Sequence, residues 1–386
     1  MKSRVRREKL QNILNREKID CAIYTLGANL QYLLNDQSLV YQRTGYSKML
    51  KGEGYFSGLN LAEYLLVIPA QGEAFLISQP HHQASLEKYG LKIITSFISH
   101  FPYYFFQELK AQRIAIGMDA HDSLAQLFKD YDSSLEIIKG ETLTDELRVI
   151  KDSEEIQLLK KAAAITDQVM AATIPLLIEG SIPVDVEAFI HKKGEALGAT
   201  DVSFPAACIY TRPGHPSAQE RIGYPKQMPL KGNTSIAFDF GFIIEGYCSD
   251  FGRSFYRGEP PQKVVDAYGA LQKGQIRMLE EIKPFQHKLS DIDRLIRERV
   301  TDLGFGEQML YGDTGICGHQ IGIDVHEDPW LINSENDLLR PGMVFCVEPK
   351  IWFPGECYMR VEDMVLITET GAESLTVFDR NLYSLD

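Results

Sequence analysis

Hydrophobic and polar positions in the first 145 residues alternate between helical and strand-like patterns. The stretch "EKLQNILNREKID" has the spacing of a short amphipathic helix, and "CAIYTL" after it is typical of a buried strand. "EYLLVIPAQGEAFLIS" predicts a hairpin that turns near Ala70, Gln71 and Gly72, and "RIAIGMD" predicts a further strand. We therefore expect a small α/β domain over residues 1–145. Within it, the Gly-, Tyr- and Lys-rich stretch 41–60 has no pattern and is predicted to be a loop or a lid.

A long amphipathic helix marks the start of a second region, which we expect to cover residues 146–386. Asp152 and Glu155 have the spacing of a capping box, and apolar residues recur on one helical face as far as Ile174, just before Pro175. Further helices are predicted at 184–197, 261–281 and 290–302, and strand runs at 234–256, 308–326, 343–353 and 358–368. The pattern predicts an α+β domain with an antiparallel sheet, larger than the first.

Composition narrows the class of protein. The chain has 386 residues, a formal net charge of −13 and 44% hydrophobic residues, which is typical of a globular protein with two domains. The acidic balance argues against a nucleic-acid partner or an anionic membrane partner, because both need a basic face. The basic N-terminus lacks the apolar stretch of a signal peptide, so we expect a cytoplasmic protein. Its six cysteines have no CxxC spacing and are predicted to be buried thiols.

Two aspartates in apolar strand sequence are the first sign of a chemical site. In "AFDFGFIIEGYCSDFGRSF", Asp239 and Asp250 flank a turn at Glu245-Gly246, and an antiparallel hairpin would bring them to one place. Two carboxylates held close together raise one pKa unless a cation lies between them. A divalent metal ion explains the pair; the alternative is two surface or N-cap aspartates.

Three further strand-like segments carry ligand-type residues. "GICGHQIGIDVHEDPW" holds His319 in small, apolar company and His326 at a strand end, where either histidine could also serve only as a hydrogen-bonded residue of the fold. Glu348 and Glu362 each interrupt an apolar strand, and Arg360 lies two residues before Glu362, as a salt-bridge partner or as a functional arginine.

Charge counting suggests how many ions this set would hold. Four carboxylates around one neutral imidazole need about four positive charges, which two divalent ions supply. Oxygen-rich ligation with a single nitrogen suits manganese, cobalt, zinc or iron. Two such ions about 3.5 Å apart would share a water and polarise a carbonyl group, which is hydrolytic chemistry.

Four ordered motifs resemble the pita-bread metallopeptidases, the family of methionine aminopeptidase, aminopeptidase P and prolidase. They are "FDFG…GYCSDFGRSF", "GHQIGIDVHEDP", "LRPGMVFCVEPKIWFPG" and "MRVEDMVLITE". The segment "LRVIKDSEEIQLLKKAAAITD" resembles the start of the catalytic domain in the proline-specific branch, and "ANLQYLLND" resembles the small N-terminal domain of that branch. The resemblance covers nearly the whole chain and implies a creatinase/prolidase-type N-terminal domain followed by a pita-bread catalytic domain.

The resemblance also implies a role for each candidate ligand. Asp239 would chelate one metal ion, Asp250 and Glu362 would bridge both ions, and His319 and Glu348 would bind the second.

Three residues would act in the reaction by the same resemblance. Glu348 would also carry the proton from the bridging water to the leaving nitrogen. His326 would stabilise the tetrahedral intermediate or help to bind the substrate, and Arg360 would order the bridging carboxylate.

The segment upstream of Asp239 departs from the family pattern. The family has a cleft histidine there after a Ser-Gly-Asn lead; here residues 203–230 lack that lead, and His215 is the candidate for the position. A loop histidine before Pro216 is the alternative interpretation of His215.

The resemblance predicts the activity and the partners. We expect a dinuclear-metal peptidase, a Xaa-Pro dipeptidase or aminopeptidase, that acts as a homodimer on short peptides with proline after the cleaved bond. The altered loop leaves open a relative that acts on a non-peptide substrate, as an amide hydrolase or a lyase. A non-enzymatic binding protein is disfavoured because all five ligand types are present.

Overall fold

The computed structural model describes the whole chain except residues 1, 26, 38, 40–63, 81–82, 97–99, 101–102, 104–108, 118–121, 215–223, 311–316 and 333–335. The predicted loop or lid at 41–60 lies outside the described residues. The chain divides into two compact units, an N-terminal unit of residues 1–148 and a C-terminal unit of residues 149–386. The sequence placed the domain boundary at 145/146, three residues before this division.

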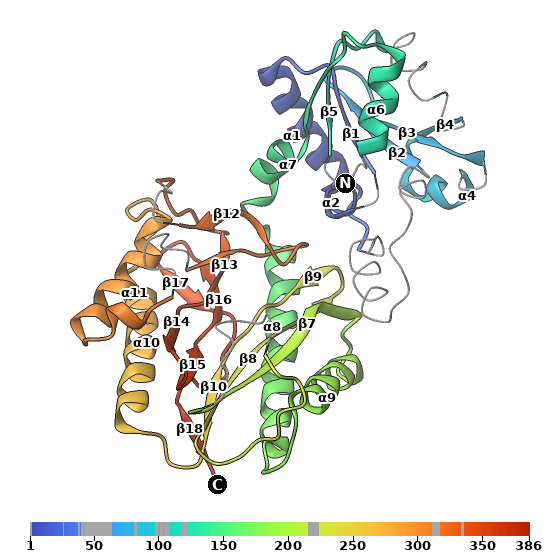
Figure 1. The fold of residues 1–386 in the computed structure, drawn as a ribbon. Helices are drawn as coiled ribbons and strands as arrows, with labels where there is room; N and C mark the ends of the chain where they lie inside the picture. Colours follow the sequence, from blue (N-terminus) through green and yellow to red (C-terminus); the bar gives the residue numbers. More distant parts are fainter. Residues whose placement is uncertain are drawn as a thin grey trace. The chain divides into compact units, whose positions relative to one another are not determined.

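The N-terminal unit is built around a six-stranded mixed sheet in the order β4-β3-β2-β1-β5-β6 (Figure 1). Its strands are β1 (Cys21–Tyr24), β2 (Tyr64–Pro69), β3 (Phe75–Ser78), β4 (Lys92–Thr95), β5 (Arg113–Ile116) and β6 (Glu136–Lys139). Its helices are α1 (Lys2–Glu17), α2 (Ala28–Leu34), α4 (Gln83–Leu86), α6 (Asp122–Tyr131) and α7 (Glu141–Arg148). The predicted hairpin is present, because β2 and β3 pair antiparallel and Gly72 takes a φ of 99° in the turn between them.

The C-terminal unit opens with α8 (Ser153–Thr173), which begins as the sequence predicts. The Asp152 side chain accepts hydrogen bonds from the backbone N–H groups of the first turn, and the Glu155 side chain accepts one from the backbone N–H of Asp152, so the capping box is complete. The Glu155 side chain also accepts a hydrogen bond from the hydroxyl of Tyr247 at 2.9 Å. The start of α8 is thereby tied to the hairpin that carries both candidate aspartates.

Three sheets follow in the C-terminal unit. The first has the order β18-β10-β8-β7, with β9 paired to β8; the second has the order β12-β11-β13-β16-β17; the third is the β14-β15 pair. Their strands are β7 (Asp201–Thr211), β8 (Thr234–Ile244), β9 (Tyr247–Cys248), β10 (Ser254–Arg257), β11 (Gly318–Gln320), β12 (Glu327–Leu331), β13 (Val344–Val347), β14 (Lys350–Phe353), β15 (Cys357–Arg360), β16 (Asp363–Ile367), β17 (Ala372–Ser374) and β18 (Tyr383–Leu385).

Helices cover these sheets from two sides. The helices α8 and α9 (Pro183–Ala196) pack on β7 and β8, whereas α10 (Gln262–Glu281) and α11 (Ser290–Asp302) pack on each other and on the strands that follow them (Figure 1). Aromatic residues pack on the first of these sheets. A chain of ring contacts joins Phe238, Phe240, Phe242, Phe251 and Phe255. The predicted helices at 184–197, 261–281 and 290–302 are confirmed to within one residue at each end.

The predicted strand run at 308–326 is wrong over most of its length. Among its described residues only Gly318–Gln320 form a strand, and the next strand, β12, begins at Glu327. Residues 321–326 form a turn instead, because the Glu327 side chain accepts hydrogen bonds from the backbone N–H groups of Ile323 and Asp324 that a sheet would otherwise use. The prediction for the cysteines is confirmed: all six are free and buried.

Candidate metal centre

Asp239 and Asp250 lie on one face of the β8 hairpin. All eleven residues of β8 are buried, Asp239 among them, and Asp250 is 4% exposed. Phe240 stands directly opposite Phe251 in the antiparallel ladder. Because side chains alternate between the two faces of a strand, Asp239 and Asp250 both point to the face opposite these rings. The sequence prediction that the hairpin brings the two carboxylates together is thus supported by the register.

His319 reaches the same place from β11. Its Nε2 lies 3.5 Å from Oδ2 of Asp250, and its Nδ1 lies 2.9 Å from the backbone oxygen of Gln320. The residue before it must be glycine: a Cβ on Gly318, which has a φ of 150°, would lie 1.8 Å from the backbone oxygen of Cys346. The close approach of β11 and β13 at this point sets the position of the imidazole.

Glu348 and Glu362 flank the guanidinium group of Arg360. One nitrogen of Arg360 donates to Glu348 Oε2 at 2.6 Å and to Glu362 Oε2, and the other pairs with Asp239. Glu362 is fully buried, and among the described residues its Oε1 has no hydrogen-bond partner. Lys350 adds a second cation, with its Nζ 2.9 Å from Glu348 Oε2.

The pKa values of Glu348 and Glu362 are shifted in opposite directions. Burial acts to raise the pKa of Glu348, but the charges of Lys350 and Arg360 outweigh it and lower that pKa to about 2. Burial raises the pKa of Glu362 well above its usual value, and the carboxylate of Asp250 adds to the rise despite the charge of Arg360. The two cations therefore do not compensate all of the negative charge that these strands bury.

The cluster also contains a cysteine, Cys346, which the sequence analysis did not single out. Ligand atoms of Asp250, His319, Cys346 and Glu362 all lie within 4.8 Å of one another. Cys346 lies directly across the ladder from His319 on β13. It precedes Glu348 by two residues in a stretch predicted to be one strand, so alternation would have placed both side chains on the same face. Lys350, two residues after Glu348, was missed although the same signal was available.

The donor set fits divalent metal ions. The four carboxylates, three of them buried and that of Glu348 half-buried, exceed the charge of Arg360 and Lys350. One buried carboxylate oxygen has no hydrogen-bond partner among the described residues, and one imidazole lies beside the carboxylates. Buried carboxylates in excess need cations, and mixed oxygen and nitrogen donors suit first-row divalent ions.

His326 stands at the edge of this cluster. Its ring is exposed and lies perpendicular to that of His319, with 4.4 Å between the ring centroids, and Trp330 packs beside both rings. The structure thus brings Asp239, Asp250, His319, Glu348, Glu362, Arg360 and His326 together, while His215 lies outside the described residues.

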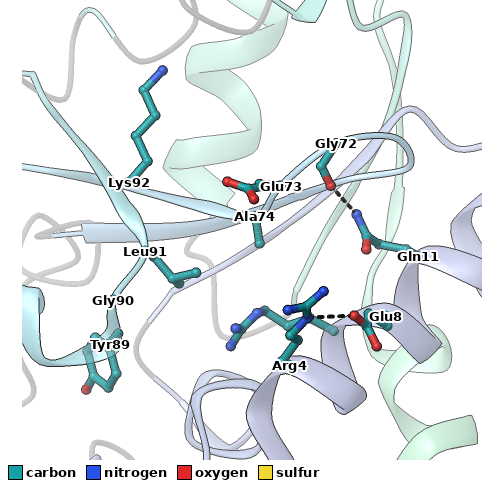
Figure 2. Close-up of a pocket in the computed structure, with 11 residues that line it drawn as sticks. Arg4, Glu8, Gln11, Gly72, Glu73, Ala74, Tyr89, Gly90, Leu91 and Lys92 are labelled. Atoms are coloured by element: carbon teal, nitrogen blue, oxygen red, sulfur yellow. Dashed lines mark hydrogen bonds and ion pairs between the residues drawn. The ribbon is translucent and has the colours of Figure 1, made fainter. Parts of the chain in front are cut away.

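The N-terminal unit contains a separate pocket. Arg4, Arg7, Glu8, Glu73 and Lys92 are among the residues that line it (Figure 2). Arg4 pairs with Glu8, and Gln11 donates to the backbone oxygen of Gly72, as the dashed lines in Figure 2 mark. Its charges are of mixed sign and partly paired, and it contains none of the predicted site residues.

Comparison with known proteins gives consistent matches. Residues 157–369, more than half of the chain, match the profile of metallopeptidase family M24. An uncharacterized peptidase of Staphylococcus saprophyticus is 28% identical over 97% of this chain and 99% of its own length. An uncharacterized peptidase of Staphylococcus aureus is 32% identical over 61% of this chain and 64% of its own length.

Solved structures resemble the chain over its whole length. A Xaa-Pro dipeptidase from Bacillus anthracis superposes with a TM-score of 0.84 at 25% identity, over 99% of this chain and 100% of that one. A prolidase from Thermococcus sibiricus superposes with a TM-score of 0.83 at 25% identity, over all of both chains. These matches confirm the predicted fold class, an α/β N-terminal domain with a pita-bread catalytic domain, and the resemblance to the proline-specific branch. The chain is an enzyme that belongs to metallopeptidase family M24.

Proposed function

We propose that this enzyme hydrolyses Xaa-Pro bonds in short peptides with two divalent metal ions held by Asp239, Asp250, His319, Glu348 and Glu362. The observation that carries the proposal is the convergence of four carboxylates, three of them buried, and one imidazole from distant parts of the sequence, with only two cations to balance them. Its likeness to a Xaa-Pro dipeptidase and to a prolidase supports proline as the residue after the cleaved bond.

Each side chain has a role that its surroundings suit. When bound, the two ions would supply an activated water and polarise the scissile carbonyl group. Glu348, which Lys350 and Arg360 keep ionised at neutral pH, would accept a proton from the activated water and pass it to the leaving nitrogen. His326, which is exposed beside His319, would donate a hydrogen bond to the developing oxyanion.

Arg360 acts as an orienting residue in this proposal. Its guanidinium group contacts Asp239, Glu348 and Glu362 and so fixes where three of the carboxylates point. A role for His215 in substrate binding, a homodimer and a cytoplasmic location stay predictions from the sequence. Among the described helices, none combines the length and the hydropathy needed to cross a bilayer.

Metal analysis and a substrate panel test the proposal. The metal-loaded enzyme should hold up to two divalent ions per chain, and Asp250→Ala should lose both the ions and the activity. Lys161 pairs with Glu245 on the exposed surface of the same unit, so Glu245→Ala is the matched control and should keep both.

The substrate panel compares Xaa-Pro dipeptides, longer peptides with proline in the second position, and non-peptide amides. Turnover of proline peptides is expected, and the lengths accepted distinguish a dipeptidase from an aminopeptidase. Full activity without metal would refute the mechanism, and turnover of the non-peptide amides alone would refute the substrate class.

A further inference from the structure

One side chain, that of Glu327, holds the turn between β11 and β12 by accepting hydrogen bonds from its backbone. Glu327 Oε1 accepts hydrogen bonds from the backbone N–H groups of Ile323 at 2.9 Å and Asp324 at 3.2 Å. Gly322 makes room for it, because a Cβ there would lie 2.6 Å from Glu327 Oε1. The turn therefore folds around this carboxylate, and His326 is the residue directly before it.

A buried lysine holds the other side of the carboxylate. Lys151 Nζ lies 3.1 Å from Glu327 Oε2 and donates to Gln320 Oε1 at 2.5 Å. The side chains of Lys151 and Glu327 are only 2% and 5% exposed. Lys151 is itself fixed at the start of α8, because its backbone N–H donates to the oxygen of Gly342 at 2.9 Å. One ammonium group thus joins the start of α8 to the end of β11 and the start of β12.

Stability alone does not account for this pair. Burying an ammonium and a carboxylate group carries a desolvation penalty, and the attraction between the two charges often does no more than offset it. Apolar residues of the same size frequently stabilise a fold to the same extent or more. The two anchored residues, however, are direct neighbours of the two histidines: Gln320 follows His319, and Glu327 follows His326. The histidine rings lie 4.4 Å apart.

We propose that Lys151 and Glu327 are positioning residues that set the place of His326 against the metal centre. This inference rests on the proposed function, in which His326 contacts the substrate. Neither Lys151 nor Glu327 touches the reacting atoms; they act through the turn of residues 321–326.

A double-mutant cycle tests the inference. Glu327→Gln keeps the length of the side chain and an acceptor for the two N–H groups, but removes the charge opposite Lys151. We expect it to lower kcat/KM for a Xaa-Pro dipeptide by about a hundredfold, the usual effect of misplacing a group by about 1 Å. In a His326→Ala background the same change should cost less than about threefold, because there is no imidazole left to misplace.

The matched control is Asp293→Asn. Asp293 is a buried carboxylate that pairs with Arg297 within α11, at 3.1 Å. Its substitution should change kcat/KM by the same factor in both backgrounds. If Glu327→Gln also costs the same factor with and without His326, the pair is merely structural and the inference is wrong.

Hydrogen exchange gives a readout that needs no activity. Glu327→Gln should speed exchange of the amides of Ile323 and Asp324 by about tenfold, because charge-assisted hydrogen bonds are the stronger ones, and Asp293→Asn should leave them unchanged. Unchanged hydrogen exchange at these two amides in Glu327→Gln would overturn the inference.

The two proposals can fail separately. If the metal-loaded enzyme cleaves no proline peptide, the proposed function is wrong, but the hydrogen exchange of the two amides still tests the inference about Lys151 and Glu327. If Glu327→Gln does not fold, the double variant Lys151→Met/Glu327→Gln is used in its place, because it removes both charges of this buried pair.

Discussion

Replacing Arg360 should destabilise the metal-free enzyme and make its stability depend strongly on metal. Arg360 is 1% exposed and contacts three carboxylates, from Asp239, Glu348 and Glu362. Removing one partner of a buried ion pair costs about 3–5 kcal/mol, because the remaining charge stays buried without compensation. For Arg360→Met without metal we therefore expect a free energy of unfolding lower by about 3–5 kcal/mol, a fall in Tm on the order of 10 °C.

Divalent ions should restore most of this loss. Metal that binds only the folded state stabilises it by about 2.7 kcal/mol at a hundred times its Kd. Without the guanidinium charge the same carboxylates attract the ions more strongly, so the metal-induced rise in Tm should be larger in Arg360→Met than in the unmodified enzyme.

Arg253→Met supplies the matched control. Arg253 is also 1% exposed, and it pairs with the carboxylate of Asp363, which the ligand set does not include. It contacts Glu362 only at the backbone oxygen, so its loss leaves the charge of the ligand carboxylates unchanged. Thermal unfolding of all three proteins, with chelator and with Mn²⁺, is the assay. Arg253→Met should lose stability equally with and without metal. The reasoning is refuted if Arg360→Met is as stable as the unmodified enzyme without metal, or if metal raises the Tm of all three proteins by the same amount.

Three further predictions follow from the same region. Gly252→Ala should lower metal occupancy, since its Cβ would lie 2.6 Å from Arg360 Nε and 2.9 Å from Glu362 Oε2; Gly232→Ala, whose Cβ meets nothing within 4 Å, should retain full occupancy by metal analysis. Because the folded-state pKa of Glu348 is lowered to about 2 from its ordinary 4.5, this carboxylate stabilises the fold above about pH 4.5, and the contribution is lost as the pH falls towards 2. Denaturant titrations between pH 4.5 and pH 2 should show a smaller loss in the free energy of unfolding for Glu348→Gln than for the unmodified enzyme. An equal loss would contradict the lowered pKa of Glu348. Native protein should expose no thiol to Ellman's reagent and denatured protein all six, because every cysteine is buried and burial raises the pKa of Cys208, Cys317 and Cys346.

Local sequence patterns were sufficient to predict two elements, the start of α8 and the β8 hairpin that carries Asp239. The capping box of α8 depends on residues three apart, and the β8 hairpin on an apolar run with a turn in it, so both could be read from neighbouring residues. Asp239 was noticeable because a charge interrupts a strand that is buried along its whole length.

Features set by distant residues could not be predicted in this way. The turn at 321–326 was taken for strand because its sequence is apolar, whereas its shape depends on Glu327 and, through it, on Lys151, 176 positions earlier. Arg360 was expected to lie on the same strand face as Glu362, but its contacts with Asp239 on β8 and with Glu348 after the end of β13 join distant parts of the sequence. Only the assembled fold brings these carboxylates within reach of one guanidinium group.

The strand β8 has a consequence for the chain before it folds. Its eleven residues, "TSIAFDFGFII", are rich in aromatic and β-branched side chains and lack proline, which is the composition of segments that assemble into cross-β aggregates. Asp239 is the one charge among them. A charge in the middle of such a segment opposes stacking of identical strands, as gatekeeper residues do. We therefore expect the carboxylate proposed to hold a metal ion in the folded enzyme to oppose self-association of the unfolded chain as well, so that a neutral residue at this position would remove both effects.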